Sequence, residues 1–303
     1  MRGGSKIPPL FLWCGRAVSV LECGSFRLAL DRPLVMGVLN VTPDSFSDGG
    51  LYASVDCAVA RGHALIAEGA DILDIGGEST RPGSQPVALD EERRRVLPVI
   101  EALASCGRPL SIDTRKPALM REAVAAGASM VNDIGALESP GALEALAGTS
   151  AAVCLMHKQG DPQTMQQNPH YEDAVKEVRD YLAHRIETAR RAGIAAGRIV
   201  IDPGFGFGKT EAHNIALLRS LSRLADLGAP VLAGLSRKAM LGRITGKPPE
   251  ERVYASVAAA LFAVQQGASI VRVHDVAATC DALAVWRALA GRIGVFSQSR
   301  APQ

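Results

Sequence analysis

Three segments of the chain repeat one arrangement, in which an alanine-rich stretch ends at a Gly-Ala pair and a short apolar run follows. The pairs are Gly69-Ala70, Gly127-Ala128 and Gly267-Ala268, and the runs after them are DILDIGG, SMVND and SIVRVHD. Glycine at the end of a helix enters the left-handed region at little cost. A helix that ends in this way and leads into a buried strand is the repeating unit of a parallel sheet covered by helices.

The same alternation of strand and helix extends over most of the chain. Apolar runs predict strands at 34–39, 71–76, 109–113, 129–133, 151–155, 199–202, 230–235 and 269–273. Helical patterns follow them at 54–68, 90–104, 117–126, 140–147, 172–192, 212–224, 250–266 and 276–290. These repeats favour an α/β fold of the closed (β/α)8 TIM-barrel type, with long loops after the first two strands. An open Rossmann-like sheet is the alternative.

Length and composition fit one such barrel. The chain has 303 residues, 48% of them hydrophobic, and single α/β barrels reach this size. No linker or change of composition marks a second domain. We expect the barrel to occupy residues 21–291, with a poorly ordered extension at 1–20 and a tail at 292–303.

Charge and cysteine usage limit the partners and the compartment. The formal net charge is +2 and basic residues are spread along the chain, which argues against a nucleic-acid or membrane-surface partner. The six cysteines form no C-x-x-C pair, so reduced thiols are expected in preference to disulfides or a metal site. The apolar run at 8–13 is too short for a signal-peptide core, and no run reaches the roughly 18 residues of a membrane helix. We therefore expect a cytoplasmic protein.

Polar residues follow the predicted strands at their carboxyl ends. In chain order they are Asn40, Glu78 with Arg81, Asp113, Asn132 with Asp133, His157, Asp202, Ser236 with Arg237 and Lys238, and Arg272 with His274. Any one of them could simply cap the next helix. In a barrel, however, all these positions converge on one mouth, where active sites are built. The series therefore predicts a site.

The composition of this predicted site indicates its ligand. Asp113, Asn132 and Asp202 offer carboxylate and amide oxygens, which suit a flat heterocycle with several N–H donors. Arg272 and His274, with Asn40 across the closure of the barrel, suit a diphosphate and a metal ion. Magnesium is the natural cation when oxygen ligands and phosphates share it.

Two loops are long and rich in glycine, proline and small polar residues. NVTPDSFSDGG (40–50) follows the first strand and GGESTRPGS (76–84) follows the second. Such loops can order on a ligand, although both could also be ordinary surface loops. Asp48 beside Phe46 in the first loop, and Arg81 beside Pro82 in the second, favour the functional interpretation.

Three features resemble other kinds of site. GFGFGKT (204–210) is not a P-loop, because Pro203 stands where that motif needs its first glycine, and Lys209 breaks the dinucleotide pattern. Lys238 could be the Schiff-base lysine of an aldolase, but a charged hydrogen-bond donor is the better interpretation beside Asp202. His157 could line the pocket or be a structural, hydrogen-bonded histidine.

At these residues the chain resembles the dihydropteroate synthases, a family of pterin-binding TIM-barrel enzymes of folate biosynthesis. The resemblance runs from about residue 33 to 290. It rests on NVTPDSFSDGG (40–50), DIGGESTRPG (74–83), SIDTRKP (111–117), VNDI (131–134), CLMH (154–157), IDPGFGFGK (201–209), GLSRK (234–238) and RVHD (272–275). The least familiar parts are Arg115 and 135–138, and neither holds a role assigned below.

The resemblance implies a reaction, a homodimer and a role for each matching residue. These enzymes join 4-aminobenzoate to 6-hydroxymethyl-7,8-dihydropterin diphosphate, giving 7,8-dihydropteroate and diphosphate. Asp113, Asn132, Asp202 and Lys238 would then hold the pterin, and Asn40, Arg272 and His274 the diphosphate with Mg2+. Phe46, Thr80, Pro82, Phe207 and Ser236 would shape the aminobenzoate site, while Asp48 and Arg81 would act from the two loops.

Physical chemistry supplies a mechanism for that reaction. The dihydropterin ring can stabilise a cation at its methylene once diphosphate leaves. Arg272, His274 and magnesium would stabilise the departing anion, and Asp113, Asp202 and Asp48 the cationic ring. The amine needs only to be positioned, so we predict a dissociative substitution in which loop closure excludes water.

Two rival functions share the predicted pterin site. A barrel that transfers a methyl group from methyltetrahydrofolate to a corrinoid needs neither the STRPG loop nor the RVH anion site, so both argue against it. A catalytically silent pterin-binding relative should have lost residues from the loops or from the anion site. None is lost in this sequence.

Overall fold

The computed structural model describes residues 20–42, 50–79, 83–161 and 163–290, with the backbone only at 50–54. Its centre is a ring of eight parallel strands. They are β3 (Leu34–Asn40), β4 (Ile72–Gly76), β5 (Leu110–Asp113), β6 (Met130–Asp133), β7 (Ala152–Met156), β8 (Ile199–Asp202), β9 (Leu232–Ala233) and β10 (Ile270–Val273). Each predicted strand is present.

The strand pairing distinguishes a closed barrel from an open sheet. The order is β8-β7-β6-β5-β4-β3-β10-β9, so the first strand of the ring, β3, pairs with the last, β10. The remaining gap, between β8 and β9, carries one parallel bridge from Ile201 to Val231. The TIM-barrel prediction is therefore confirmed, and the open Rossmann-like sheet is excluded.

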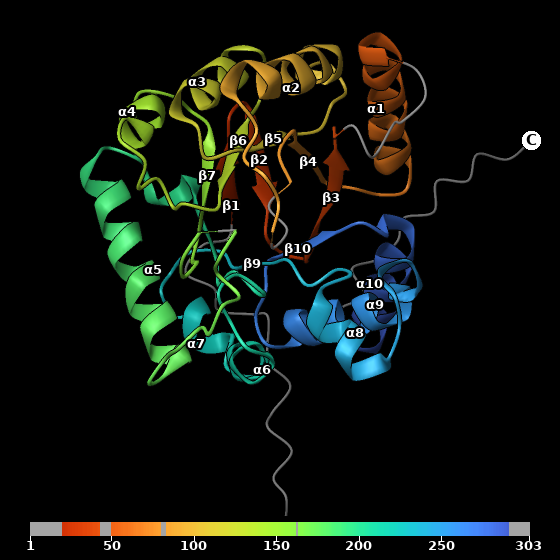
Figure 1. Cartoon of the computed structure of the whole chain (residues 1–303). Helices are drawn as coiled ribbons and strands as arrows, with labels where there is room; N and C mark the ends of the chain where they lie inside the picture. Colours follow the sequence, from red (N-terminus) through yellow and green to blue (C-terminus); the bar gives the residue numbers. More distant parts are fainter. Residues whose placement is uncertain (1–19, 43–49, 80–82, 162, 291–303) are drawn as a thin grey trace, which may run out of the picture.

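Helices surround the ring, as Figure 1 shows. They are α1 (Gly50–Ala67), α2 (Leu89–Leu103), α3 (Pro117–Ala125), α4 (Ala142–Ala147), α5 (Ala174–Arg191), α6 (Glu211–Arg219), α7 (Ser222–Ala225), α8 (Ala239–Thr245), α9 (Val253–Gln265) and α10 (Val276–Leu289), with 3-10 turns η2 (Ala196–Arg198) and η3 (Pro249–Glu251). The helix predicted at 212–224 is in fact divided into α6 and α7. The sequence prediction also lacked α8, a seven-residue helix with Gly242 inside it and a left-handed Gly246 at its end.

A hairpin that the sequence prediction lacked closes the amino end of the barrel. It consists of β1 (Val20–Cys23) and β2 (Phe26–Ala29), which pair antiparallel. Leu21 and Cys23 join the apolar cluster inside the barrel, and the Gly24 N–H donates to the Ser150 carbonyl at 3.0 Å. These short strands fall at the start of the predicted barrel, where four-residue runs give no periodic signal.

The strand register shows which side chains face the interior. The inner apolar cluster includes Met36, Ile72, Met130, Val200 and Ile270, one from each of five strands. Because strand side chains alternate between the two faces, residues two or four positions further along also point inwards. The carboxyl half of the interior is therefore the place for polar side chains.

None of the described helices is both long and apolar enough to cross a bilayer. The predicted extension and tail lie outside the described residues, apart from Val20, which begins β1.

Candidate active site

Polar side chains fill the inner face above the apolar cluster. They stand two residues beyond inner apolar positions of β4, β6, β8 and β10, or at the end of β5. These residues are Asp74, Asn132, Asp202, Arg272 and Asp113. The four other than Arg272 are at most 9% exposed, so their interactions take place largely away from water. The structure thus brings together four of the residues predicted from strand ends, and adds Asp74.

Arg272 is at the centre of this group. Its Nε donates to Asp74 Oδ2 at 2.6 Å and its Nη2 donates to Asp113 Oδ2 at 2.9 Å. Asn132 Nδ2 donates to the same Asp74 oxygen at 3.1 Å. Burial alone would lower the pKa of Arg272, but Asp74 and Asp113 more than offset this and raise that pKa above its usual value. Arg272 is therefore a fixed cation.

Burial raises the pKa of both carboxyl groups predicted to hold the heterocycle. Burial raises the pKa of Asp113 to about 7, with Arg272 opposing the shift and Asp74 adding to it. Burial also raises the pKa of Asp202, although the Gly204 N–H, which donates to Asp202 Oδ1 at 2.7 Å, opposes that shift. Asp113 can therefore gain or lose a proton near neutral pH, and burial favours the protonated form of Asp202 in the same direction.

Lys238 lies just after β9, at the N-cap of α8, on the side of the mouth formed by the glycine-rich loop after β8. Its Nζ donates to the Phe205 carbonyl and lies 4.4 Å from the centre of the Phe207 ring, a cation–π contact. Burial lowers the pKa of Lys238 to about 8, while Asp202 favours the charged form. The structure thus brings together two predicted residues, Lys238 and Phe207.

Ser236 and His274 follow β9 and β10 and contact each other. His274 Nδ1 is 3.0 Å from Ser236 Oγ, and the His274 backbone N–H donates to the same oxygen at 3.2 Å. Asn40 ends β3, where it pairs in register with Gly76 of β4. The five predicted residues of the two long loops, Phe46, Asp48, Thr80, Arg81 and Pro82, lie outside the described residues.

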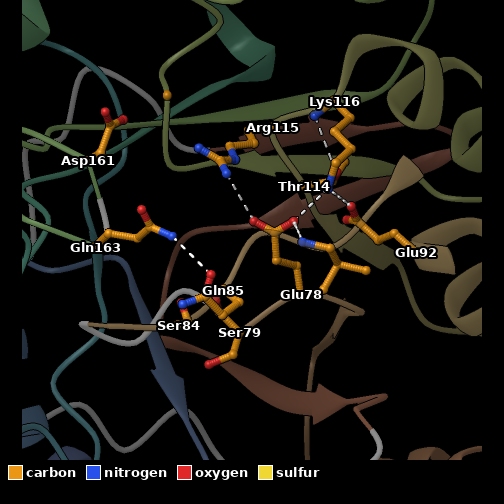
Figure 2. Close-up of polar contacts among 12 residues, drawn as sticks. Glu78, Ser79, Ser84, Gln85, Glu92, Thr114, Arg115, Lys116, Asp161 and Gln163 are labelled. Atoms are coloured by element: carbon orange, nitrogen blue, oxygen red, sulfur yellow. Dashed lines mark hydrogen bonds and ion pairs between the residues drawn. The ribbon is translucent and has the colours of Figure 1, made fainter. Parts of the chain in front are cut away.

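The base of the loop after β4 is held by an ion cluster of two glutamates with largely buried side chains and two partly exposed basic residues, shown in Figure 2. Lys116 Nζ, from the loop after β5, donates to Glu78 Oε2 at 2.6 Å and to Glu92 Oε2. Arg115 Nη2 lies 3.3 Å from Glu78 Oε1, and the Val87 N–H donates to Glu78 Oε2 at 3.1 Å. The two ends of the segment 78–87 are therefore fixed to each other and to the strand that carries Asp113.

A second cross-link joins this segment to the loop after β7. Gln163 Nε2 donates to Gln85 Oε1 at 3.3 Å, as Figure 2 shows. Within the segment, Ser84 Oγ donates to the Ser79 carbonyl at 2.5 Å. Loops from three strands thus support one another at the mouth.

The glycine-rich segment 204–209 is a folded support and no P-loop. A Cβ at Gly204 would stand 1.9 Å from the His157 carbonyl oxygen, and both Gly204 and Gly208 have positive φ. Lys209, 2% exposed, donates to the carbonyls of Gly204 and Phe207, each at 2.9 Å. Burial lowers the pKa of Lys209 to about 7.

His157 belongs to the same support. Its Nδ1 lies 2.9 Å from Lys209 Nζ. Burial, and then the neighbouring Lys209, lower the pKa of His157 to about 3. His157 is buried and its ring contacts Lys209, which supports the interpretation as a structural, hydrogen-bonded histidine.

Sequence reasoning missed Asp74, Lys116 and Glu92. Asp74 is fully buried in the middle of the strand ILDIG, whereas only residues at strand ends were considered. A charge inside an apolar strand was the signal that could have found it. Lys116 and Glu92 carry no such signal, because charged residues beside a helix start are usually solvated.

The predicted magnesium ligand among the described residues is Asn40, which ends β3 at the mouth of the barrel. Among the described residues there is no group of three or more His, Cys, Asp or Glu side chains that could hold a metal. The amide oxygen of Asn40 is the kind of hard oxygen ligand that magnesium takes, together with phosphate oxygens and water.

Comparison with known proteins agrees with this geometry. Residues 36–274 match the family of pterin binding enzymes. The chain is 52% identical over 277 residues to a dihydropteroate synthase of Neisseria meningitidis serogroup B, covering 89% of this chain and 97% of that one.

Two solved structures are similar over nearly the whole fold. A Xanthomonas albilineans dihydropteroate synthase with 4-aminobenzoic acid superposes with a TM-score of 0.85 at 57% identity, covering 90% of this chain and 98% of that one. A Burkholderia cenocepacia dihydropteroate synthase complexed with 7,8-dihydropteroate gives a TM-score of 0.83 at 53% identity, covering 90% and 97%. With its closed barrel and the polar cluster at its mouth, the chain belongs to the pterin-binding enzymes and, among them, to the dihydropteroate synthase family.

Proposed function

We propose that the chain condenses 6-hydroxymethyl-7,8-dihydropterin diphosphate with 4-aminobenzoate, giving 7,8-dihydropteroate and diphosphate, by a dissociative substitution. The observation that carries this proposal is the buried group of Asp113, Asn132 and Asp202 around the fixed cation Arg272. The group combines acceptors for ring N–H donors with a cation for an anionic leaving group. The complexes of relatives with 4-aminobenzoic acid and with 7,8-dihydropteroate support the same substrates.

The pterin ring would be held by acceptors whose protonation can change. Asp113 and Asp202 are buried carboxyl groups with raised pKa values, and Asn132 supplies an amide beside them. Hydrogen bonds from ring N–H groups to ionised carboxylates are stronger than those to neutral acceptors. Lys238 would complete the ring site from the opposite loop. As positive charge develops on the ring, Asp113 and Asp202 can stabilise it at close range.

The diphosphate would be held by Arg272 and His274. Arg272 stays charged throughout, because the pKa of its guanidinium is raised by its two carboxylate partners. His274 is positioned by Ser236, which contacts both its backbone N–H and its ring. Mg2+, with Asn40 as one ligand, would supply further charge neutralisation for the leaving group.

The aminobenzoate would bind beside the pterin, next to the glycine-rich segment. Phe207 and Ser236 are the described members of that predicted site. The aromatic amine is a sufficient nucleophile toward a cationic methylene, so the residues need to position it and no strong general base is required. The roles of Phe46, Thr80 and Pro82, and of Asp48 and Arg81, stay predictions.

Product analysis tests this function against its rivals. Purified full-length chain is incubated with both substrates and Mg2+, and the pterin products are separated by chromatography. We expect dihydropteroate together with an equal amount of diphosphate. Pterin bound without any dihydropteroate would instead indicate a silent relative, and methyl transfer from methyltetrahydrofolate would indicate the methyltransferase.

A homodimer in the cytoplasm completes the proposal. Large apolar side chains are exposed on three helices that lie side by side (Figure 1), with Tyr254 of α9 85% exposed and Leu289 of α10 83% exposed. Exposed apolar side chains on neighbouring helices support a role of this surface in an interface. The cysteines of the described residues are free thiols, which suits a reducing compartment. Light scattering should give twice the chain mass of 31.8 kDa, and Tyr254→Lys should lower it toward the monomer value.

A further inference from the structure

We propose that Asp74 is a positioning residue for this reaction, which holds Arg272 by its Nε so that the guanidinium stays aligned to receive the leaving diphosphate. The inference rests on the proposed function. Asp74 itself would touch neither substrate, and its effect would pass through Arg272.

The place of Asp74 in the fold sets it apart from the other acids of the mouth. It stands in the middle of β4, in register with Val38 of β3 and Ser111 of β5, and is fully buried. A carboxylate inside a barrel of apolar strands is costly unless it is paired. Asp74 has such a partner in Arg272, from a strand 198 residues away in sequence.

The contacts of Asp74 are concentrated on one oxygen. Oδ2 accepts from Arg272 Nε at 2.6 Å and from Asn132 Nδ2 at 3.1 Å. Oδ1 is buried and has no hydrogen-bond partner among the described residues. The hydrogen bonds of Asp74 therefore join it to Arg272 and Asn132.

Arg272 is held along one edge by two carboxylates. Nε is bound by Asp74 and Nη2 by Asp113, while no hydrogen bond or ion pair joins Nη1 to the described residues. Asp113 is the acid predicted to accept hydrogen bonds from the pterin, so its carboxylate would be divided between Arg272 and the ring when the ring binds. Asp74 lies one inner-face position deeper in the barrel and keeps its bond. It is therefore the anchor that fixes the plane of the guanidinium throughout the reaction.

Fixing that plane matters because the leaving group gathers charge as the bond breaks. A preorganised guanidinium fork stabilises a developing anion without reorganisation at that moment. A guanidinium held by Asp113 alone could turn when the ring binds. We therefore expect loss of Asp74 to lower kcat more than it changes the KM for either substrate.

The test is a double-mutant cycle between Asp74 and Arg272, with Asp71 as the matched control. Asp71 precedes the same strand, is also buried, and also pairs with an arginine, since Arg32 Nη2 lies 2.5 Å from its Oδ1. It belongs to the opposite end of the barrel. Asp74→Asn keeps the shape and one acceptor oxygen, whereas Asp74→Ala removes both oxygens. Circular dichroism and thermal melts show whether each variant is folded.

We expect kcat to fall at least 30-fold in Asp74→Ala and less in Asp74→Asn, with both KM values within threefold. In an Arg272→Met background, Asp74→Ala should change kcat less than twofold, because the residue through which it acts is gone. Asp71→Asn should lower the melting temperature and leave kcat within twofold. Equal losses from Asp74→Ala in both backgrounds, or no loss in either, would overturn the proposal.

A binding measurement keeps this inference separate from the proposed function. Calorimetry with inorganic diphosphate and Mg2+ needs no turnover. Free diphosphate carries the charge that the leaving group has only after the bond breaks, so it should respond to Asp74 more than the bound substrate does. We expect Asp74→Ala to weaken diphosphate binding about tenfold when Arg272 is present and less than threefold when it is Met. If the unaltered chain binds diphosphate but makes no dihydropteroate, the proposed function fails while the cycle still decides the role of Asp74. Unchanged diphosphate affinity in Asp74→Ala would contradict that role.

Discussion

Replacing Lys116 by methionine should destabilise the protein strongly, although its side chain is partly exposed at the start of α3. Its ammonium is the shared partner of Glu78, whose side chain is 9% exposed, and of Glu92, whose side chain is fully buried. Glu92 Oε1 already lacks a hydrogen-bond partner among the described residues. Lys116→Met therefore leaves a buried carboxylate with no cation. Removing one partner of a buried pair costs about 3–5 kcal/mol.

The expected loss is near the lower end of that range, about 3 kcal/mol, because Arg115 still faces Glu78 at 3.3 Å and Lys116 is itself partly exposed. Urea unfolding of the full-length chain, followed by far-UV circular dichroism, measures the loss. Lys176→Met is the matched control, since Lys176 pairs with Asp180 at 2.7 Å on the open surface of α5. Exposed pairs contribute little, so no measurable change is expected there.

A double variant locates the cause. Glu92→Gln in the Lys116→Met background removes the uncompensated charge and should recover a large part of the lost stability. The reasoning would be refuted if Lys116→Met behaved like Lys176→Met, or if Glu92→Gln added a further loss of its own. Either result would mean that the cluster in Figure 2 does not hold the loop base in solution.

Three further predictions follow from the site. The pKa of Asp113 is raised to about 7, so the carboxylate that accepts hydrogen bonds from the ring becomes protonated as the pH falls. The affinity for 6-hydroxymethylpterin should therefore decrease, approaching tenfold per pH unit below pH 7, and an affinity that changes as little with pH as that of Asp113→Asn would contradict this. Gly204→Ala should lower the free energy of unfolding by about 3 kcal/mol or more, because its Cβ would stand 1.9 Å from the His157 carbonyl oxygen at a position with positive φ. Gly228→Ala, whose Cβ meets nothing within 4 Å, should lower it by about 1 kcal/mol, and equal melting temperatures for the two variants would refute the prediction. The pKa of Lys209 is lowered to about 7, so above that pH the unfolded chain binds one more proton than the folded protein does. The free energy of unfolding should therefore rise by about 1 kcal/mol per pH unit from pH 7 to 9, relative to Lys209→Met, and parallel pH curves for the two proteins would exclude this linkage.

The barrel could be predicted because each of its strand-and-helix units has a recognisable local sequence pattern. A glycine that ends a helix, an apolar run and a polar strand end recur along the chain, and the structure has a strand at each predicted place. The hairpin of β1 and β2 could not be predicted, since its stability comes from contacts with Ser129 and Ser150, more than 100 residues away. The predicted strand at 230–235 is shorter, with only Leu232–Ala233 in the ladder, because the chain turns before Arg237, which has a positive φ of 59°.

The candidate site was predictable at the strand ends and not below them. Asp113, Asn132, Asp202 and Arg272 stand where a barrel places functional groups, so position alone identified them. Asp74 could not be predicted as a site residue, because its role depends on a contact with Arg272, which lies on a strand distant in sequence. The cluster of Lys116 with two glutamates likewise depends on how the loop after β4 folds back, which no local pattern encodes.

The most direct test of the account is diphosphate release by the purified protein with dihydropterin diphosphate and Mg2+, measured with and without 4-aminobenzoate. We expect dihydropteroate and diphosphate in equal amounts when both substrates are present. Without 4-aminobenzoate we expect slow release of diphosphate, as water captures the pterin cation. Release that requires 4-aminobenzoate at every concentration would contradict the dissociative mechanism, and tight pterin binding with no release in either case would contradict the roles of Arg272 and His274.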